Sequence, residues 1–209
     1  MVMRLHWHPF SLFPRRVRIA VREKGIACEE VEVDLPGGAT RGAAFRRLNP
    51  FGQVPVLEDD GLVICESLAV LEYLEERHPL PALLPADAAQ RAQVRQWMLA
   101  SGDYFAPPFK RWLTRLFLPE SAWDRDDQAR AADELGEHLD VLEGVLGRGD
   151  YIVGTFSLAD VAYAPLVCEL AACGLAHLLE PRPAVRAWVE RLRARPAVQS
   201  TSPTPAAAA

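Results

Sequence analysis

The stretch from residue 49 to residue 67 reads NPFGQVPVLEDDGLVICES, and its pattern decides the fold class. VPVLED and LVICE have the aliphatic, β-branched composition of strands. Asp59-Asp60-Gly61 lies between them and is a turn sequence. The stretch therefore predicts a β-hairpin, in a chain of 209 residues whose other segments decide what packs against it.

Pro55 lies inside the first of these two predicted strands, where a proline removes a hydrogen bond from the ladder. We expect a cis Val54-Pro55 bond and an edge strand, because this arrangement resolves the conflict. The Val54 N–H and C=O would then face outward and pair with an extended peptide. The alternative without a ligand is an edge strand that tolerates its proline.

The segments on either side of the hairpin alternate between strand and helix patterns. Residues 3–8 predict a strand, 14–25 an amphipathic helix that ends at Gly25, and 28–35 a strand of clean period-2 alternation. A glycine-rich loop over 36–42 leads to a short helix over 43–50, and a leucine-spaced helix follows the hairpin at 66–78. The order βαβ, α, ββ, α predicts a small α/β sandwich with a mixed sheet.

Strand patterns are absent after about residue 88, so the second half is predicted to be all-helical. A helix over residues 88–117 should kink or break at Pro107-Pro108. The segment 157–174 is nearly all apolar and should be the central buried helix. We place the α/β domain at 1–78, a proline-rich linker at 79–87, the all-helical domain at 88–200 and a frayed tail at 201–209.

Composition excludes several functions. The formal net charge is −5, so the chain has no general attraction to nucleic acid or to anionic membranes. No apolar run approaches the roughly 20 residues that span a bilayer, and the N-terminus lacks the pattern of a signal peptide. The four cysteines show no metal or disulfide spacing, and we expect no metal site. These features predict a cytoplasmic protein.

Three local features bear on chemistry. Ser67 precedes a helix, where it serves as an N-cap, yet a helix N-terminus also receives an anion and Glu66 beside it could accept from an ammonium group. An α-amino acid end carries both charges on one carbon. Ser11 follows the first strand, where α/β ligand sites lie, and a loop or capping role is its alternative. No serine-hydrolase triad accompanies it, so Ser11 would act as a hydrogen-bond donor.

These motifs together resemble the cytosolic glutathione transferases. The resemblance rests on Ser11 followed by RVRIA (16–20), NPFGQVPVL (49–57), ESLAVLEYL (66–74) and GTFSLADVAY (154–163), in order and with matching spacing. It implies a thioredoxin-like N-terminal domain, an all-helical C-terminal domain and a homodimer. It also implies glutathione as co-substrate.

The resemblance assigns a role to each matching residue. Ser11 stands where serine-type members keep the hydroxyl that bonds the glutathione sulfur, and no cysteine lies nearby to favour thiol transfer. The remaining glutathione contacts implied are Gln53, Val54 with cis Pro55, Glu66 and Ser67, with Arg41 the best of several basic candidates for the glycine carboxylate. Ser157 and Asp160 match a structural capping box. Phe51 matches an aromatic key that enters the partner subunit, and a core phenylalanine is its alternative.

The resemblance also implies an electrophile pocket, whose expected members are Phe13 of the first half and Tyr104, Pro108, Phe109 and Trp112 of the second. An aromatic stripe at helical spacing is also typical of a helical core, which is the alternative. The resulting hypothesis is a glutathione transferase that attacks small hydrophobic electrophiles. Two alternatives stay open: a specialised glutathione-dependent isomerase, dehalogenase or lyase, and a non-catalytic relative that keeps the fold.

Overall fold

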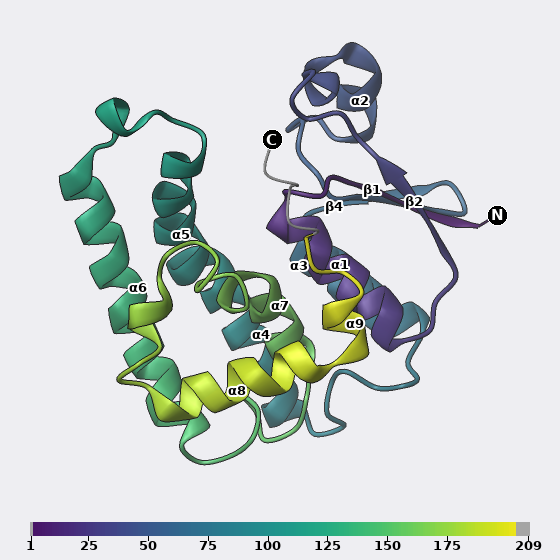
Figure 1. Cartoon of the computed structure of the whole chain (residues 1–209). Helices are drawn as coiled ribbons and strands as arrows, with labels where there is room; N and C mark the ends of the chain where they lie inside the picture. Colours follow the sequence, from purple (N-terminus) through teal and green to yellow (C-terminus); the bar gives the residue numbers. More distant parts are fainter. Residues whose placement is uncertain (1, 204–209) are drawn as a thin grey trace. The chain divides into compact units, whose positions relative to one another are not determined.

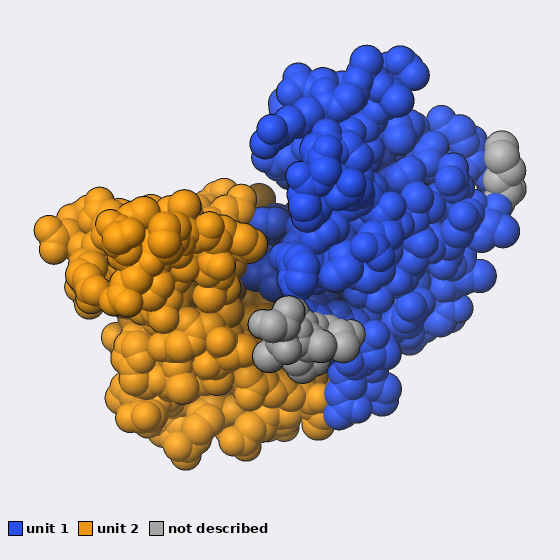
Figure 2. All heavy atoms as spheres, turned by 45° about the horizontal axis from the view of Figure 1, so that its top comes forward, with its two compact units in different colours: residues 1–83, 196–209 blue, residues 84–195 orange. Residues whose placement is uncertain are grey.

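The computed structural model describes residues 2–203, and the chain divides into two compact units, coloured separately in Figure 2. One unit runs from the N-terminus to Leu83 and takes up the chain again from Pro196. The other unit comprises Leu84–Arg195. The predicted pairing of an α/β unit with an all-helical unit is confirmed.

The first unit is built on a four-stranded mixed sheet of order β2-β1-β3-β4. The strands are β1 (Met3–Trp7), β2 (Cys28–Glu32), β3 (Val56–Asp59) and β4 (Leu62–Cys65). β1 pairs parallel with β2 and antiparallel with β3, and β3 pairs antiparallel with β4. Leu5 on β1 lies opposite Leu57 on β3, and both are fully buried, so the sheet centre is also the centre of the core.

The hairpin is confirmed, but its first strand is not an edge. β3 lies between β1 and β4, and it begins at Val56, so Pro55 stands just outside the ladder and removes no hydrogen bond from it. The Val54-Pro55 bond is cis, as expected. The two-residue turn places Asp60 at φ 46° and Gly61 at φ 84°, the positive values that a tight hairpin turn requires.

Three helices cover the sheet. Figure 1 shows α1 (Leu12–Glu23) and α3 (Ser67–Arg77) together on one face and α2 (Ala43–Leu48) beyond the other. Side-chain alternation along β3 supplies both layers: Val56 packs with Phe45 of α2, and Leu57 is buried on the opposite face. A buried ion pair of 2.6 Å between Lys24 and Glu75 joins the C-terminal ends of α1 and α3.

The second unit contains α4 (Ala88–Ala100), α5 (Ala106–Leu113), α6 (Arg125–Leu146), α7 (Leu158–Val167) and α8 (Pro183–Ala194). All ten residues of α7 are buried, which confirms it as the central helix. Ser157 and Asp160 form the predicted capping box at its N-terminus. Asp160 also accepts hydrogen bonds from the Ile152 N–H and the Trp188 indole, and burial raises its pKa to about 6.

The expected kink or break at Pro107-Pro108 takes a different form. One turn of π-helix (Ser101–Phe105) joins α4 to α5, and the two prolines follow directly in the first turn of α5. A proline costs little in a first turn, because that N–H lacks an intrahelical partner, and a π turn shifts the hydrogen-bond register just before it. The helical segment therefore continues through the proline pair.

The C-terminal end of the chain differs from the expected domain bounds. The short helix α9 (Pro196–Gln199) belongs to the first unit, where the buried Arg15 side chain donates to the Val198 carbonyl and, over 2.9 Å, to the Ser202 hydroxyl. Thr201 is also buried, so the expected fraying does not begin at residue 201. Residues 204–209 of the expected tail lie outside the described residues.

Candidate functional site

The loop before β3 is held by one buried amide. The Asn49 side chain, 1% exposed, donates to the Gln53 carbonyl over 2.7 Å and accepts from the Phe51 N–H over 3.0 Å. Gly52 has φ 64°, and a Cβ there would stand 2.9 Å from the Thr40 carbonyl oxygen. Only glycine suits both demands, so the direction in which Gln53 and Val54 leave the loop is set by the backbone.

The main-chain N–H and C=O of Val54, which comes directly after Gln53, are the next feature of this loop. The residue is buried, yet within residues 2–203 neither its N–H nor its C=O takes part in a hydrogen bond. Because main-chain groups of this kind seek partners, the segment is suited to pairing with an added peptide. This is the arrangement expected for Val54, although it precedes an interior strand and not an edge strand.

The entry to α3 corrects one expectation. Glu66, not Ser67, is the N-cap residue, and Ser67 is the first residue of the helix. Glu66 has φ 69°, which costs a non-glycine residue on the order of 1–3 kcal/mol and is found most often at functional sites. The Glu66 side chain makes no capping hydrogen bond and is exposed, so its carboxylate stays available at the helix N-terminus.

Ser11 is the N-cap residue of α1, which has 12 residues. Its backbone is extended, with φ −96° and ψ 117°, and its hydroxyl makes no capping hydrogen bond. Its N–H donates instead to the His8 carbonyl over 3.0 Å. The half-buried hydroxyl therefore lies at the positive end of a helix dipole without being consumed by the cap.

Arg16 connects these two helix entries, and the sequence reading assigned it no role. Arg16 is 2% exposed, and its guanidinium lies 4.8 Å from the centre of the Phe13 ring and donates to the Ser67 hydroxyl over 3.2 Å. The sequence does offer one signal for such a residue, which is a charged side chain on the apolar side of a helix. A buried charge needs a partner, so such a residue can be expected to make a specific contact. Its partner on α3 was not predictable from the spacing.

The basic candidate Arg41 lies at the exposed end of a 3-10 turn (Ala39–Arg41). The preceding residue, Thr40, presents its carbonyl to Gly52, so this turn runs beside the loop that carries Gln53. A Cβ on Gly52 would also lie 3.9 Å from Nε of Arg46 on α2. Arg46 is therefore a second basic residue near this loop, and the sequence reading did not single it out.

The aromatic stripe divides between core and surface. Phe109 is 1% exposed and packs beside Phe105, and Trp112 donates its indole N–H to the Cys173 carbonyl. With the buried Pro108, these residues belong to the core of the helical unit, which was the stated alternative. Tyr104 is 69% exposed, and Phe13 is half-buried in the other unit. Of the five residues predicted for the electrophile pocket, Phe13 and Tyr104 are the two that lie outside that core.

None of the helices within residues 2–203 combines the length and the apolarity that crossing a bilayer requires. In the same part of the chain, no cluster of three or more His, Cys, Asp or Glu side chains could hold a metal ion.

Comparison with known proteins identifies the family. The family model described as glutathione S-transferase, N-terminal domain, matches residues 10–77, and the model for the C-terminal domain of the same family matches 105–196. Glutathione S-transferase F10 of Arabidopsis thaliana is 33% identical over 93% of this chain and 94% of its own, and glutathione S-transferase 3 of Zea mays is 34% identical over 95% and 92%. The crystal structure of glutathione transferase F7 from Populus trichocarpa superimposes with a TM-score of 0.88 at 29% identity, over 96% of this chain and 97% of that one.

The fold and these relatives define a two-unit transferase with a thioredoxin-like first unit. The chain belongs to the glutathione S-transferase family. It is an enzyme of that family, and its co-substrate is glutathione.

Proposed function

We propose that the Ser11 hydroxyl donates a hydrogen bond to the sulfur of bound glutathione and holds it as the thiolate. The observation that carries this proposal is the position of the Ser11 hydroxyl at the N-terminus of α1, where it makes no capping hydrogen bond. A thiol with a pKa near 8.5 is only a few per cent ionised at pH 7, and the thiolate is the nucleophile. A hydroxyl donor and a helix dipole both favour S⁻ over SH, so Ser11 needs no base to act.

The other glutathione contacts follow from the same unit. The unpaired peptide groups of Val54, next to cis Pro55, pair with the cysteinyl residue. The Glu66 carboxylate accepts a hydrogen bond from the ammonium group of the γ-glutamyl residue. The N-terminus of α3 at Ser67 binds the α-carboxylate of that same γ-glutamyl residue. Gln53 and Arg41 contact the glycine end, where a cation favours the terminal carboxylate.

The electrophile we propose is small and hydrophobic. Aromatic rings favour such a ligand, and the contacts we propose are the half-buried Phe13 of the first unit and the exposed Tyr104 of the helical unit. The thiolate attacks the electrophilic carbon, forms a thioether and expels the leaving group or adds to a double bond. Nothing in the described side chains favours a specialised isomerase or lyase over this transfer.

We also propose a cytoplasmic homodimer. Phe51 is 71% exposed, so its core alternative is wrong, and its loop is held by Asn49. On the helical unit, Trp97 and Val141 border a pocket of about 450 Å³. An exposed aromatic ring and an apolar hollow on one chain are complementary surfaces when two copies meet. The four free cysteines suit a reducing compartment.

The test is an ultraviolet titration of bound glutathione against pH, with Ser11→Ala beside the parent protein. We expect a thiolate signal at neutral pH in the parent, and in Ser11→Ala a rise of about one unit in the pKa of the bound thiol. The value of kcat/KM at neutral pH should fall about 10- to 100-fold. Ser121→Ala, an exposed serine of the helical unit, is the matched control and should change neither quantity.

Each contrary outcome has a distinct meaning. If glutathione binds and ionises equally well in Ser11→Ala, the hydroxyl is misassigned and another donor acts on the sulfur. If glutathione binds without ionising in the parent, the thiolate mechanism fails while the binding assignments survive.

A further inference from the structure

The chain between β1 and α1 is a single tight turn, and Ser11 is its last residue. The Ser11 N–H donates to the His8 carbonyl over 3.0 Å, which closes a β-turn. Pro9 stands at the second position of this turn, where its fixed φ is favoured. The Trp7 carbonyl, at the end of β1, accepts from the Val33 N–H over 2.8 Å. The turn therefore starts from backbone that is held by a neighbouring segment of the chain.

The His8 side chain closes the same turn a second time. The Phe10 N–H donates to Nδ1 of His8 over 3.3 Å. The donor lies two residues further along the chain, which is the pattern of an Asx-turn, where an asparagine or aspartate oxygen accepts from that N–H. Nδ1 of histidine is bonded to Cγ, as Oδ1 of asparagine is, so the ring nitrogen takes the place of that oxygen. Two hydrogen bonds therefore fix the turn, one from its main chain and one to the imidazole.

The imidazole is itself held in one state and one place. Because a main-chain N–H only donates, Nδ1 is the acceptor, and the neutral ring carries its proton on Nε2. His8 is 7% exposed, and its ring centre lies 5.5 Å from that of Phe10. A buried ring in contact with a second ring keeps its acceptor atom in place.

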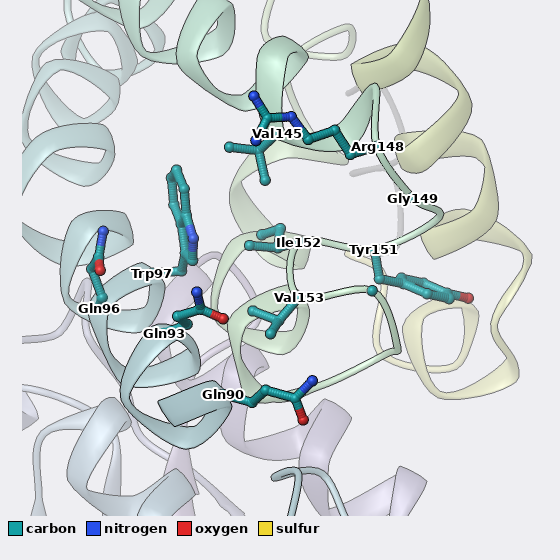
Figure 3. Close-up of a pocket in the computed structure, with 11 residues that line it drawn as sticks. Gln90, Gln93, Gln96, Trp97, Val145, Arg148, Gly149, Tyr151, Ile152 and Val153 are labelled. Carbon is teal, nitrogen blue, oxygen red and sulfur yellow. The ribbon is translucent and has the colours of Figure 1, made fainter. Parts of the chain in front are cut away.

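A turn of the helical unit shows what the imidazole adds. The Gly154 N–H donates to the Tyr151 carbonyl over 3.0 Å, the same closing bond as in the turn before α1. Figure 3, a close-up of a pocket in that unit, includes this turn and shows the Tyr151 ring extending away from Ile152 and Val153. The main-chain bond is thus enough to form a turn. The acceptor on His8 is an additional constraint on the backbone that leads to Ser11.

We propose that His8 is a positioning residue for the thiolate reaction, and this inference rests on the proposed role of Ser11. By holding the Phe10 N–H, Nδ1 fixes the backbone just before Ser11 and so the direction in which the Ser11 hydroxyl leaves it. A hydrogen bond weakens steeply when its donor is turned away from the acceptor. Loss of the Nδ1 acceptor would therefore reduce stabilisation of the thiolate, while the contacts proposed for Val54 and Glu66 keep glutathione bound.

Three substitutions of His8 separate its acceptor from its bulk. His8→Asn keeps an acceptor where Nδ1 stands, and His8→Leu removes it. His8→Gln keeps a polar side chain of similar size but places its oxygen one bond further from the backbone. The measurements are the pKa of the bound glutathione thiol, by ultraviolet titration, and the steady-state values of kcat and KM. Circular dichroism of each variant checks that it is folded.

We expect His8→Leu and His8→Gln to raise the pKa of the bound thiol by about half a unit to one unit. Below the pKa of the parent, kcat should then fall about three- to tenfold, while KM for glutathione stays within about twofold. His8→Asn should stay within about twofold of the parent in both constants, because it restores the acceptor. His177→Leu is the matched control, since this histidine is exposed in a 3-10 turn of the helical unit, and it should change neither constant.

A double-mutant cycle tests whether His8 acts through Ser11. In the Ser11→Ala background, His8→Gln should add no further rise in the pKa of the bound thiol. An added rise, or equal losses in His8→Asn and His8→Gln, overturns the inference. If Ser11→Ala raises the pKa and His8→Gln does not, His8 is no positioning residue and the role of Ser11 stands. If Ser11→Ala leaves the pKa unchanged, both fail. If His8→Leu does not fold, the comparison of His8→Gln with His8→Asn decides alone.

Discussion

Nη1 of Arg16 donates a hydrogen bond to Oγ of Ser67 over 3.2 Å, and both residues are buried. Arg16 lies in the second turn of α1, whose N-cap is Ser11, and Ser67 begins α3. This contact therefore joins the helix entry proposed to bind the sulfur to the helix entry proposed to bind the γ-glutamyl end. It explains how two short motifs more than fifty residues apart can serve one ligand.

Replacement of Arg16 should affect stability and glutathione binding together. Arg16→Met removes a buried cation and leaves Ser67 without its donor, so we expect a loss of about 2–4 kcal/mol in the free energy of unfolding and a higher KM for glutathione. Urea unfolding and steady-state kinetics measure the two effects. Arg22→Met, on the same helix but more exposed, is the control and should cost under about 1 kcal/mol. An unchanged KM in folded Arg16→Met would separate this contact from ligand binding.

Two glycines of positive φ should respond differently to alanine. Gly52→Ala meets both an unfavourable φ of 64° and a Cβ position 2.9 Å from the Thr40 oxygen, whereas Gly61→Ala, at φ 84°, has no atom within 4 Å. We expect Gly61→Ala to lower the free energy of unfolding by about 1–2 kcal/mol without changing the Kd for glutathione. Gly52→Ala should lower the free energy of unfolding by more and should raise the Kd for glutathione. Calorimetric titration with thermal unfolding tests both. Equal behaviour of the two variants would exclude the Thr40 contact as the cause.

Two buried groups of the helical unit should have opposite effects on stability in acid. The pKa of Asp160 is raised by burial to about 6, so its contribution to stability is greatest below its ordinary pKa of 3.8 and is lost as the pH rises through 6. Burial lowers the pKa of His138 to about 4, so its contribution is present above 6.5 and is lost as the pH falls through 4. The two slopes oppose each other between about pH 4 and 6.

Single substitutions should reveal each slope. His138→Gln keeps a neutral partner beside the Tyr163 hydroxyl and removes the histidine titration. Because the titration of Asp160 remains, we expect the free energy of unfolding of this variant to decline from about pH 4 to 6. The free energy of unfolding of Asp160→Asn should rise over the same range. This variant should be less stable throughout, because asparagine keeps only one accepting oxygen and its NH2 group cannot accept from either the Ser157 N–H or the Ile152 N–H and Trp188 indole. Urea unfolding of both variants across this pH range measures the two pH dependences. Parallel pH profiles for both variants would contradict the assignment.

The homodimer proposal rests on Phe51 and is tested by its removal. We expect Phe51→Ser to shift the population toward monomer, with the dimer Kd raised about tenfold or more, since an exposed aromatic anchor contributes on the order of 2 kcal/mol at an interface. Analytical ultracentrifugation measures the change. Phe117→Ser removes an equally exposed ring, 74% against 71%, and should leave the oligomeric state as it is. A parent protein that sediments as a monomer would refute the proposal directly.

The sequence was sufficient to predict those features of the structure that depend on residues close together in the chain. The hairpin of residues 56–65, the cis Val54-Pro55 bond, the buried helix α7 and the Ser157–Asp160 capping box were all predictable, because alternation, turn residues and capping chemistry act between near neighbours in the chain. Motif order was likewise enough to indicate the family. The sequence also pointed to Ser11, Val54 and Glu66 as candidates.

Contacts between distant segments required the tertiary structure. β3 is an interior strand because β1 and β4 pair on its two sides, and no local pattern reports strand order. Phe109 and Trp112 are core residues and Phe51 is exposed, although all three are aromatic. The Arg16–Ser67 hydrogen bond and the return of α9 to Arg15 are also long-range contacts. Local propensity determines which element a segment forms, but burial and partnership depend on how those elements pack, and that is set by the whole chain.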